Sequence, residues 1–419
     1  MARSQQPNSK TVVVGAGIIG TTIAYTLQRR GETVVLIDRN QPGRGASFGN
    51  MASIAVTEFM PASRPSVWAQ MPKWLLDREG PMRIRPAYMP RLVPWFLRFL
   101  AASWPSKLRE LEAAGAALCG RVHEDLAALL SETGLQHMLS AEGCLSLYAD
   151  EAEFRADREH IKILERFGLR HQVLHGYAIR ELEPALASKI GKAVLFPDNR
   201  SISDPYKLVV ALLEAFQALG GTIVRGDVVA FEQSETGISA LRLKDGRRLE
   251  ADRVVLAAGA YTAGFSTKLG EPIPLETERG YSTQIMAPGI SMRHSIIWPA
   301  RAFMVTPTAG GIRVGGTVEM AGLEAPPDYR RAKVLVKRAK EALPDLTVDE
   351  ASEWMGHRPA LPDTVPVMGP SAKHHNVFYA TGHGHLGLTY AATTGRLMAD
   401  LVTGAKPPID MNPYRVDRF

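Results

Sequence analysis

Apolar and polar positions near the start of the chain predict a strand, a helix and a second strand. Valines at residues 12–14 form an apolar run, and Ile23, Ala24 and Leu27 follow with helical spacing. A second apolar run ends at Asp38. This order of elements is typical of an α/β fold with a parallel sheet.

Three glycines occupy the turn between the first strand and the helix. Gly15 permits the tight turn, Gly17 allows close approach of a pyrophosphate, and Gly20 lets the helix pack on the strand. The N–H groups at the helix start attract phosphate, and Asp38 is placed to bind ribose hydroxyls. The pattern predicts dinucleotide binding; the alternative is a glycine turn that serves packing alone.

A loop rich in Gly, Ser and Asn follows the second predicted strand. The Ser47 hydroxyl and the backbone of Ala46, Gly49 and Asn50 are candidate donors to the pyrophosphate. An ordinary surface turn is the alternative.

A second glycine-rich stretch, residues 376–404, repeats the pattern without a terminal acid. An apolar strand runs into Gly382, Gly384 and Gly387, and a helix follows. A helix N-terminus carries partial positive charge, which stabilises the negative charge of a reduced flavin. A nicotinamide has no equivalent need, so this stretch favours FAD over NAD.

The middle of the chain predicts further α/β elements and a separate sheet. Residues 106–133 have the spacing of a long helix closed by Gly134, and a helix is expected over about 151–167. Asp204 and Pro205 begin another helix, and residues 254–256 form a strand before Ala258 and Gly259.

These patterns predict two interleaved domains. The expected FAD-binding domain comprises residues 1–86, 195–272 and 351–419, and the expected substrate domain comprises residues 87–194 and 273–350. The substrate domain is expected to hold an antiparallel sheet, because residues 273–320 read as successive strands with a turn at Gly310 and Gly311.

The segment 87–104 combines aromatic and basic residues. Pro94 is expected to begin a helix, and Arg91 and Arg98 alternate with Trp95 and Trp104 around apolar positions of helical spacing. A helix buried against another domain or subunit is the favoured interpretation, and a helix at a membrane surface is the alternative.

The amino-acid composition narrows the classes of protein to which the chain can belong. Of 419 residues, 45% are hydrophobic and 22% charged, as in ordinary globular proteins, and the net charge of +6 comes without a dense basic run or nucleic-acid motif. Two cysteines and the lack of a His/Cys cluster predict no metal site. Without an apolar signal core or a run near ~18 apolar residues, the expected location is cytoplasmic.

Several motifs carry a family resemblance. The segments VVVGAGIIG, GASFGN, VVLAAGA, GHRPALPDTVPVMG and GHGHLGLT resemble the FAD-dependent D-amino-acid oxidase superfamily, in its D-amino-acid dehydrogenase branch. Further blocks, PLETERGY and WMGHRP among them, are similar to the glyphosate oxidoreductase group of that branch. The resemblance spans the chain. It implies a Rossmann-like FAD-binding domain beneath an antiparallel substrate domain.

The resemblance also implies a set of FAD contacts, with Val228 holding the adenine side through its backbone. The predicted FAD-binding residues are Gly15, Ala16, Gly17, Ile18, Ile19, Gly20, Asp38, Arg39, Ala46, Ser47, Asn50, Met51, Val228, Ala258, Gly259, Gly382, Gly384, His385, Leu386, Gly387 and Leu388.

The resemblance places a carboxylate-binding arginine at Arg358, since a planar guanidinium can make two parallel hydrogen bonds to a carboxylate. A structural ion pair is the alternative. His385 is a candidate beside the flavin, and Tyr281 resembles a tyrosine at the start of a substrate-domain strand. Arg301 is a candidate only because a second anionic group on the substrate would need a partner.

The implied reaction is hydride transfer from an amino or imino acid to flavin N5, giving an imine that hydrolyses to an oxo acid plus ammonia or an amine. D-proline, D-hydroxyproline and glyphosate-type amines are candidate substrates. An FAD-dependent 2-hydroxyacid dehydrogenase is the first alternative, and a non-enzymatic electron-transfer flavoprotein is the second. The electron acceptor, whether quinone, electron carrier or oxygen, stays open.

Overall fold

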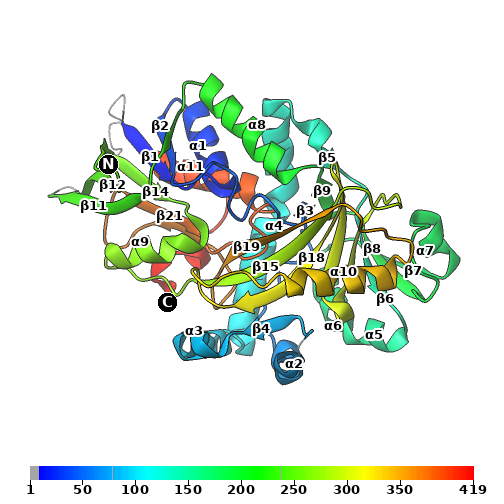
Figure 1. The fold of residues 1–419 in the computed structure, drawn as a ribbon. Coiled ribbons are helices and arrows are strands. Elements are labelled where there is room, and N and C mark those ends of the chain that lie inside the picture. Colours follow the sequence, from blue (N-terminus) through cyan, green and yellow to red (C-terminus); the bar gives the residue numbers. More distant parts are fainter. Residues whose placement is uncertain (1–8, 78, 236) are drawn as a thin grey trace.

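Two large sheets organise the chain in the computed structural model, which describes residues 9–77, 79–235 and 237–419 (Figure 1). The first sheet has six strands in the order β10-β2-β1-β14-β21-β20. All neighbours run parallel except β20, which is antiparallel to β21. The strands are β1 (Lys10–Val14), β2 (Thr33–Asp38), β10 (Thr222–Arg225), β14 (Arg253–Leu256), β20 (Val367–Pro370) and β21 (Val377–Thr381).

Helices cover one face of this sheet and a small sheet covers the other. Helix α1 (Ile18–Arg29) packs between α8 (Pro205–Ala218) and α11 (Ala391–Thr403), and α4 (Pro105–Thr133) packs on α11. The opposite face shares a core with the antiparallel strands β11, β12 and β13. Their bounds are Val228–Ser234, Gly237–Leu243 and Arg248–Glu250. This arrangement confirms the predicted α/β class with a parallel sheet.

The second sheet has nine strands in the order β19-β15-β18-β17-β16-β6-β8-β7, with β4 paired to β18. Most neighbours are antiparallel, although β16 runs parallel to β6 and β4 runs parallel to β18. The strands are β4 (Met82–Ile84), β6 (Cys144–Tyr148), β7 (Gln172–His175), β8 (Lys192–Phe196), β15 (Glu276–Ile285), β16 (Ser295–Trp298), β17 (Phe303–Thr308), β18 (Gly311–Met320) and β19 (Ala351–Ala360).

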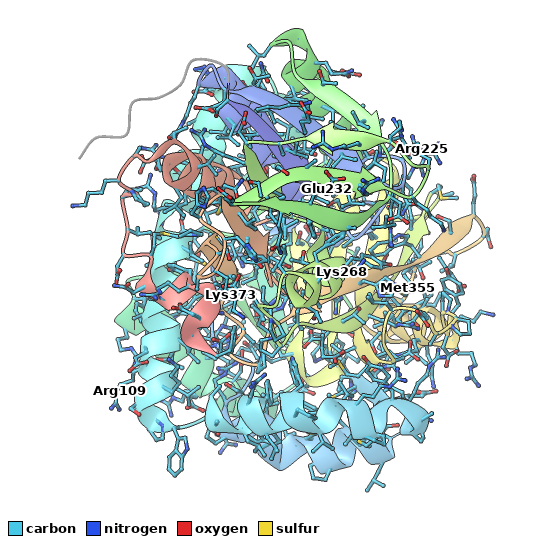
Figure 2. The ribbon with its side chains drawn as sticks, turned by 90° about the vertical axis from the view of Figure 1, so that its left-hand side faces the viewer. Arg109, Arg225, Glu232, Lys268, Met355 and Lys373 are labelled. Atoms are coloured by element: carbon cyan, nitrogen blue, oxygen red, sulfur yellow. The ribbon has the colours of Figure 1, made fainter. Side chains whose placement is uncertain are left out.

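Helix α10 (Arg330–Ala342) covers one face of the nine-stranded sheet. Near the start of β15, helices α2 (Pro65–Leu76) and α3 (Met89–Ala101) share a core with residues of the other face, including Met320 and Ala360. In Figure 2 these two helices form a separate layer below the rest of the molecule.

The remaining elements connect the two halves. A three-stranded sheet joins β3 (Ser53–Ile54), β9 (Arg200–Ile202) and β5 (Leu139–Ser140). The short helices are α5 (Glu151–Ala156), α6 (Arg158–Arg166), α7 (Tyr177–Leu182) and α9 (Thr262–Lys268). The 3₁₀ turns are η1 (Pro86–Tyr88), η2 (Gln136–Met138), η3 (Gly259–Tyr261), η4 (Pro299–Arg301), η5 (Asn412–Tyr414) and η6 (Val416–Arg418).

The domain boundaries differ from those expected at two places. Residues 351–360 were assigned to the FAD-binding domain, but β19 pairs with β15 along its whole length. Residues 82–84 likewise join the nine-stranded sheet through β18. Both segments carry backbone groups whose ladder partners lie far away in sequence, and local patterning contains no information about such partners.

Two helix predictions also change. The helix expected over about 151–167 is divided into α5 and α6 at Asp157, whose backbone leaves the helical conformation. Pro94 was expected to begin a helix but lies inside α3, which begins at Met89 with Pro90 in its first turn. The long helix α4 ends where predicted, with Gly134 in the left-handed conformation.

Candidate active site

The first glycine turn brings α1 into direct contact with the end of β14. Gly15 has φ +107°, and a Cβ added there would lie 2.5 Å from the Ala257 carbonyl oxygen. A Cβ on Gly20 would lie 1.8 Å from the Gly15 carbonyl oxygen. The close helix–strand packing predicted for Gly20 is therefore present.

The N-terminus of α1 is buried and lacks a capping side chain. Gly17 is its N-cap residue, and the first turn contains no acid. The Ile18 N–H donates to Ser47 Oγ over 2.9 Å, and Ile19 follows in the same turn. A buried helix start with free donors suits an anionic group such as a pyrophosphate.

Asp38 lies beside this turn at the end of β2. Its Oδ2 accepts a hydrogen bond from Ala16 N over 2.7 Å, and its Oδ1 accepts one from Asn40 N over 2.8 Å. Each carboxylate oxygen keeps capacity for a second donor. The adjacent Arg39 guanidinium stacks on Tyr261, 3.7 Å from the ring centroid.

Open space lies at the carboxyl ends of two neighbouring strands. A Cβ added to Gly259, after β14, or to Gly384, after β21, would meet no atom within 4 Å. The Thr381 hydroxyl donates to the Gly259 carbonyl oxygen over 2.9 Å and ties the two turns together. Ligands of parallel α/β sheets bind at this edge, so the residues present fit an extended dinucleotide such as FAD.

The loop after β21 reaches across to the nine-stranded sheet. The Gly384 N–H donates to the Pro359 carbonyl oxygen over 2.8 Å, which places the loop beside Arg358. His383 is buried and its Nε2 lies 3.0 Å from Thr394 Oγ1. Burial lowers the pKa of His383 to about 3, so this histidine is a neutral structural residue.

His385 differs from His383 in its surroundings. Its side chain is accessible, yet burial still lowers its pKa, and the nearby Arg358 charge lowers it further. The Glu58 carboxylate opposes this shift. His385 is thus an exposed side chain of the glycine loop that lies within electrostatic range of Arg358.

Arg358 lies on β19 and faces the FAD-binding half of the molecule. Its Nη1 donates to the Thr317 carbonyl oxygen over 3.0 Å. Its guanidinium covers Gly280, because a Cβ added there would lie 2.3 Å from Nη2. Burial lowers the pKa of Arg358, and the Glu278 carboxylate opposes that shift. The side chain remains partly accessible, so its other donors can meet a ligand.

The same face holds the loop predicted to follow the pyrophosphate. The Ser282 hydroxyl donates to the Gly49 carbonyl oxygen over 2.8 Å. Arg313 Nη1 donates to the Asn50 carbonyl oxygen over 2.6 Å. Met51 packs against the sheet, 2.1 Å from the position of a Cβ added to Gly315. These contacts fix the loop between the two sheets.

Tyr281, a predicted catalytic residue, lies on the opposite face. Residues of β15 alternate between faces, so the Tyr281 side chain points toward α10 while its neighbour Gly280 lies under Arg358. Tyr281 is buried, donates to Glu319 and accepts from the Asp328 N–H over 2.9 Å. The prediction that Tyr281 belongs to the site is wrong, and the residue stabilises the core beneath α10.

Arg301 is also outside the site. It is exposed in η4, where its Nε lies 3.5 Å from Glu341 Oε2 and its guanidinium lies 5.5 Å from the Trp298 ring centroid. Glu341 belongs to α10, on the face of the sheet opposite Arg358. This position contradicts the expectation that Arg301 binds a second anionic group of the substrate.

The remaining predicted FAD contacts fall into two places. Along the glycine turns lie Ala46, Ala258, Gly382, Leu386, Gly387 and Leu388. Val228 is buried where β11 begins, in the core shared with β2 and β14. Gly382 has φ +81° and is packed on Leu361. The turn therefore needs the conformational freedom of a glycine at this position.

Sequence reasoning missed three residues on the Arg358 face. Glu278 lies opposite Arg358 on β15. The Trp354 ring packs against Gly49 and Gly356, and Glu58 acts on His385. Glu278 and Trp354 lie in motifs that the resemblance had marked, PLETERGY and WMGHRP, but only strand pairing shows which of their residues share a face.

Within the described ranges, no three His, Cys, Asp or Glu side chains gather as a metal site would require. In the same ranges, no helix has both the length and the apolarity needed to cross a membrane.

Comparisons with known proteins agree with this geometry. The family described as "DAO: FAD dependent oxidoreductase" matches residues 10–401. A D-amino-acid oxidase from Bradyrhizobium diazoefficiens is 32% identical, over 97% of this chain and 98% of its own. A D-amino acid dehydrogenase from Rhizobium johnstonii is 30% identical, over 98% of this chain and 100% of its own.

Solved structures share the fold. Glycine oxidase from Geobacillus kaustophilus superposes with a TM-score of 0.75 at 21% identity, covering 98% of this chain and 100% of its own. Iminodiacetate oxidase from Chelativorans sp. BNC1 gives 0.74 at 20% identity, covering 97% of this chain and 98% of its own.

Proposed function

The chain belongs to the DAO family of FAD-dependent oxidoreductases, and on that premise we propose that it oxidises the C–N bond of a D-amino acid or a related secondary amino acid. The observation that carries the proposal is Arg358, a partly accessible guanidinium beside the second glycine loop. Relatives at 30–32% identity are named for D-amino acids.

Arg358 would bind the substrate carboxylate. One donor is already held by the Thr317 carbonyl, which fixes the guanidinium plane and leaves the others for the ligand. The burial that lowers the pKa of Arg358 also strengthens a charge-assisted pair with a carboxylate, because the local dielectric constant is lower than in water. The carboxylate anchor would set which bond of the substrate faces the cofactor edge near Gly259 and Gly384.

The first glycine turn, Asp38 and the loop at Ser47 would hold FAD, which when bound supplies the acceptor for the hydride of the substrate Cα–H bond. The product imine would hydrolyse in water to an oxo acid and ammonia or an amine. Candidate substrates are D-proline, D-hydroxyproline and glyphosate-type amines. The net charge of +6 is consistent with an anionic substrate.

The test is the variant Arg358→Ala with Arg301→Ala as its matched control. We expect R358A to raise KM and lower kcat/KM at least tenfold, because losing a buried charge partner costs about 2–5 kcal/mol. R301A should stay within about twofold, since Arg301 is exposed and paired with Glu341. Unchanged kinetics in R358A would remove Arg358 from the site.

The same preparation separates the alternative functions. The purified protein is mixed without oxygen with D-proline, D-hydroxyproline, sarcosine, glycine, iminodiacetate, glyphosate and a set of 2-hydroxy acids. Bleaching of the flavin by amines alone supports the proposal. Bleaching by hydroxy acids alone indicates a 2-hydroxyacid dehydrogenase, and no bleaching by either class indicates an electron-transfer protein.

We also propose that α3 contacts an anionic membrane surface. Met89, Val93, Leu97, Leu100 and Trp104 recur every three or four residues and are all exposed, Leu97 at 61% and Trp104 at 70%. The buried side of the helix carries Leu92, Trp95 and Phe99 instead. An exposed apolar stripe of this kind is unusual on a protein surface that contacts only water.

Charge around the stripe supports a lipid partner over a protein partner. Residues 80–109 contain no Asp or Glu, while Arg91, Arg98 and Arg109 are exposed. In Figure 2 Arg109 projects near the layer formed by α2 and α3. Basic side chains flanking an apolar helix face favour anionic headgroups. Such contact would bring the enzyme close to membrane quinones, one of the open electron acceptors.

Vesicle co-sedimentation tests this contact. The protein should sediment with vesicles containing phosphatidylglycerol and much less with phosphatidylcholine alone. Leu97→Glu should weaken binding about tenfold, because burying the exposed leucine in the membrane would contribute roughly 1.5–3 kcal/mol. Leu219→Glu, at an exposed leucine on the end of α8, is the control. Equal binding by L97E and wild type, or dimerisation without sedimentation, would overturn the proposal.

A further inference from the structure

The strand pairing sets one carboxylate directly opposite the substrate-binding arginine. Glu278 on β15 pairs with Arg358 on β19, in a register that runs unbroken from Glu276 to Ile285. Side chains of directly paired residues project from the same face. Glu278 and Arg358 therefore share one face of the sheet, and both side chains are partly accessible.

The two charges nevertheless do not meet. In the part of the chain that the structure describes, no nitrogen lies within 4 Å of the Glu278 carboxylate as an ion pair, and the carboxylate has no hydrogen-bond donor. The Arg358 guanidinium instead covers Gly280, two residues along the strand. The Arg358 guanidinium is held by the Thr317 carbonyl, and the Glu278 carboxylate lies beyond ion-pair distance from it.

An enclosed carboxylate without a donor is costly, so its position calls for a ligand. The side chain is partly accessible, yet burial raises its pKa and only the Arg358 charge opposes the shift. Glu276, two residues earlier on the same face, provides the contrast. Its Oε2 accepts a hydrogen bond from Tyr88 over 2.9 Å, so Glu276 already has its partner.

The charged groups that face Glu278 are few. Arg358 lies across the strand pair on β19, and Glu276 lies on β15 itself. Met320, its partner on β18, is apolar, as is the core that α2 and α3 share with Ala360. The Arg358 charge also acts on His385 of the C-terminal loop, whose pKa it lowers.

We propose that Glu278 recognises the amino group of the substrate while Arg358 holds its carboxylate, so that the paired strands select zwitterionic amino acids. This inference rests on the proposed function. A proton passes from the substrate ammonium to a Glu278 oxygen: one N–H bond breaks, one O–H bond forms, and the nitrogen keeps its lone pair. The result is a neutral amine beside a neutral carboxylic acid, which is the state needed for oxidation at the C–N bond.

Glu278 suits this proton transfer better than His385. Enclosure disfavours the charged form of each group. Burial therefore lowers the pKa of His385 and raises the pKa of Glu278. A carboxylate also attracts the ammonium before the proton moves, whereas a neutral imidazole has no charge to offer.

The experiment uses the FAD-loaded enzyme and pairs of probes that differ only in the amine. D-proline is paired with tetrahydrofuran-2-carboxylate, and glycine is paired with acetate, so that one pair serves whichever amine the wild type prefers. For each variant, kcat/KM is measured for the amine from pH 6 to 10, and the affinity for the amine-free acid is measured by calorimetry. FAD content and thermal midpoint report on folding.

Glu278→Gln should lower kcat/KM for the amine at least about tenfold and shift the acidic limb of its pH profile. Its affinity for the amine-free acid should change less than about twofold, because Arg358 is intact. Glu278→Asp should restore part of the activity. The control Glu276→Gln, a neighbouring carboxylate with its own partner, should leave both readouts within about twofold.

Equal weakening of both probes in E278Q would indicate a structural role and overturn the inference, as would an unchanged pH profile. If the wild type oxidises amines and E278Q has the same kcat/KM, this inference is overturned, but the proposed function still stands. If no amine bleaches the flavin of the wild-type enzyme, the proposed function itself is wrong, whatever E278Q does.

Discussion

Gly20 illustrates how much of this molecule depends on the absence of single side chains. Its Cα lies against the Gly15 carbonyl, so α1 can approach the end of β14 closely enough to aim its N-terminus at the sheet edge. Gly280 serves the opposite sheet in the same way, since the Arg358 guanidinium occupies the space of its missing Cβ. In both places a methyl group would displace functional atoms.

Gly20→Ala is expected to separate α1 from the sheet. Its Cβ would lie 1.8 Å from backbone oxygen, which cannot move away as a flexible side chain would. Overpacking of this kind costs about 1–3 kcal/mol, and FAD content should fall with it. Thermal melting and the flavin absorbance of purified protein measure the two effects.

Gly120→Ala in α4 is the matched control, because a Cβ there meets no atom within 4 Å, its φ is not in the left-handed region and it is outside the predicted FAD contacts. Equal loss of FAD in the two variants would show that packing at Gly20 does not matter.

At the scale of elements, helix ends follow simple local rules in this chain. Asp204 caps α8, where its Oδ1 accepts from the N–H groups of Tyr206 and Lys207 over 3.0 Å each, and Pro205 occupies the first turn. Helix α3 departs from such rules, because Pro94 lies in its interior and its apolar stripe faces outward. That departure is the element-scale reason to expect a partner for α3.

Asp204→Ala should destabilise the protein by about 1 kcal/mol, the usual cost of losing an N-cap. Asp204→Asn keeps the acceptor and should retain most of the stability. Chemical denaturation followed by helical circular dichroism compares the two variants. If the alanine and asparagine variants lose stability equally, the carboxylate charge rather than the cap hydrogen bond is responsible.

At the scale of the whole molecule, two sheets meet with the cofactor edge of one facing the Arg358 face of the other. The contact is made by loops: Gly384 bonds to Pro359, and the Gly49 and Asn50 carbonyls accept from the nine-stranded sheet. Burial at this junction shifts the pKa values of titratable groups, so the stability of the fold depends on pH.

The pKa of the buried His383 indicates in which direction the stability changes with pH. Burial lowers its pKa to about 3, against about 6.5 in an unfolded chain. Between these values the unfolded state binds more protons, so stability is lost as the pH falls below about 6.5. His357, with its pKa lowered to about 4, acts in the same direction.

The wild type should therefore lose stability between pH 7.5 and 5, with roughly 2 kcal/mol arising from His383. His383→Gln should lose less over the same interval, because glutamine does not titrate. Melting temperatures of the two proteins across this range make the comparison. A pH dependence that is identical in both would show that His383 does not contribute.

The sequence by itself determined the parts that depend on neighbouring residues. The glycine turn before α1, the cap at Asp204 and the end of α4 at Gly134 are all local features, since backbone freedom and capping act within one turn. FAD binding and the α/β class followed from the same stretches and from family resemblance.

Tertiary structure alone decided which side chains share a face. Tyr281 and Gly280 are adjacent in sequence, yet pleating sends one into the core beneath α10 and the other under Arg358. Glu278 lies 80 residues from Arg358 along the chain (358 − 278), and only the β15–β19 register brings the pair together. Such register is set by hydrogen bonds between distant strands, and no local pattern encodes it.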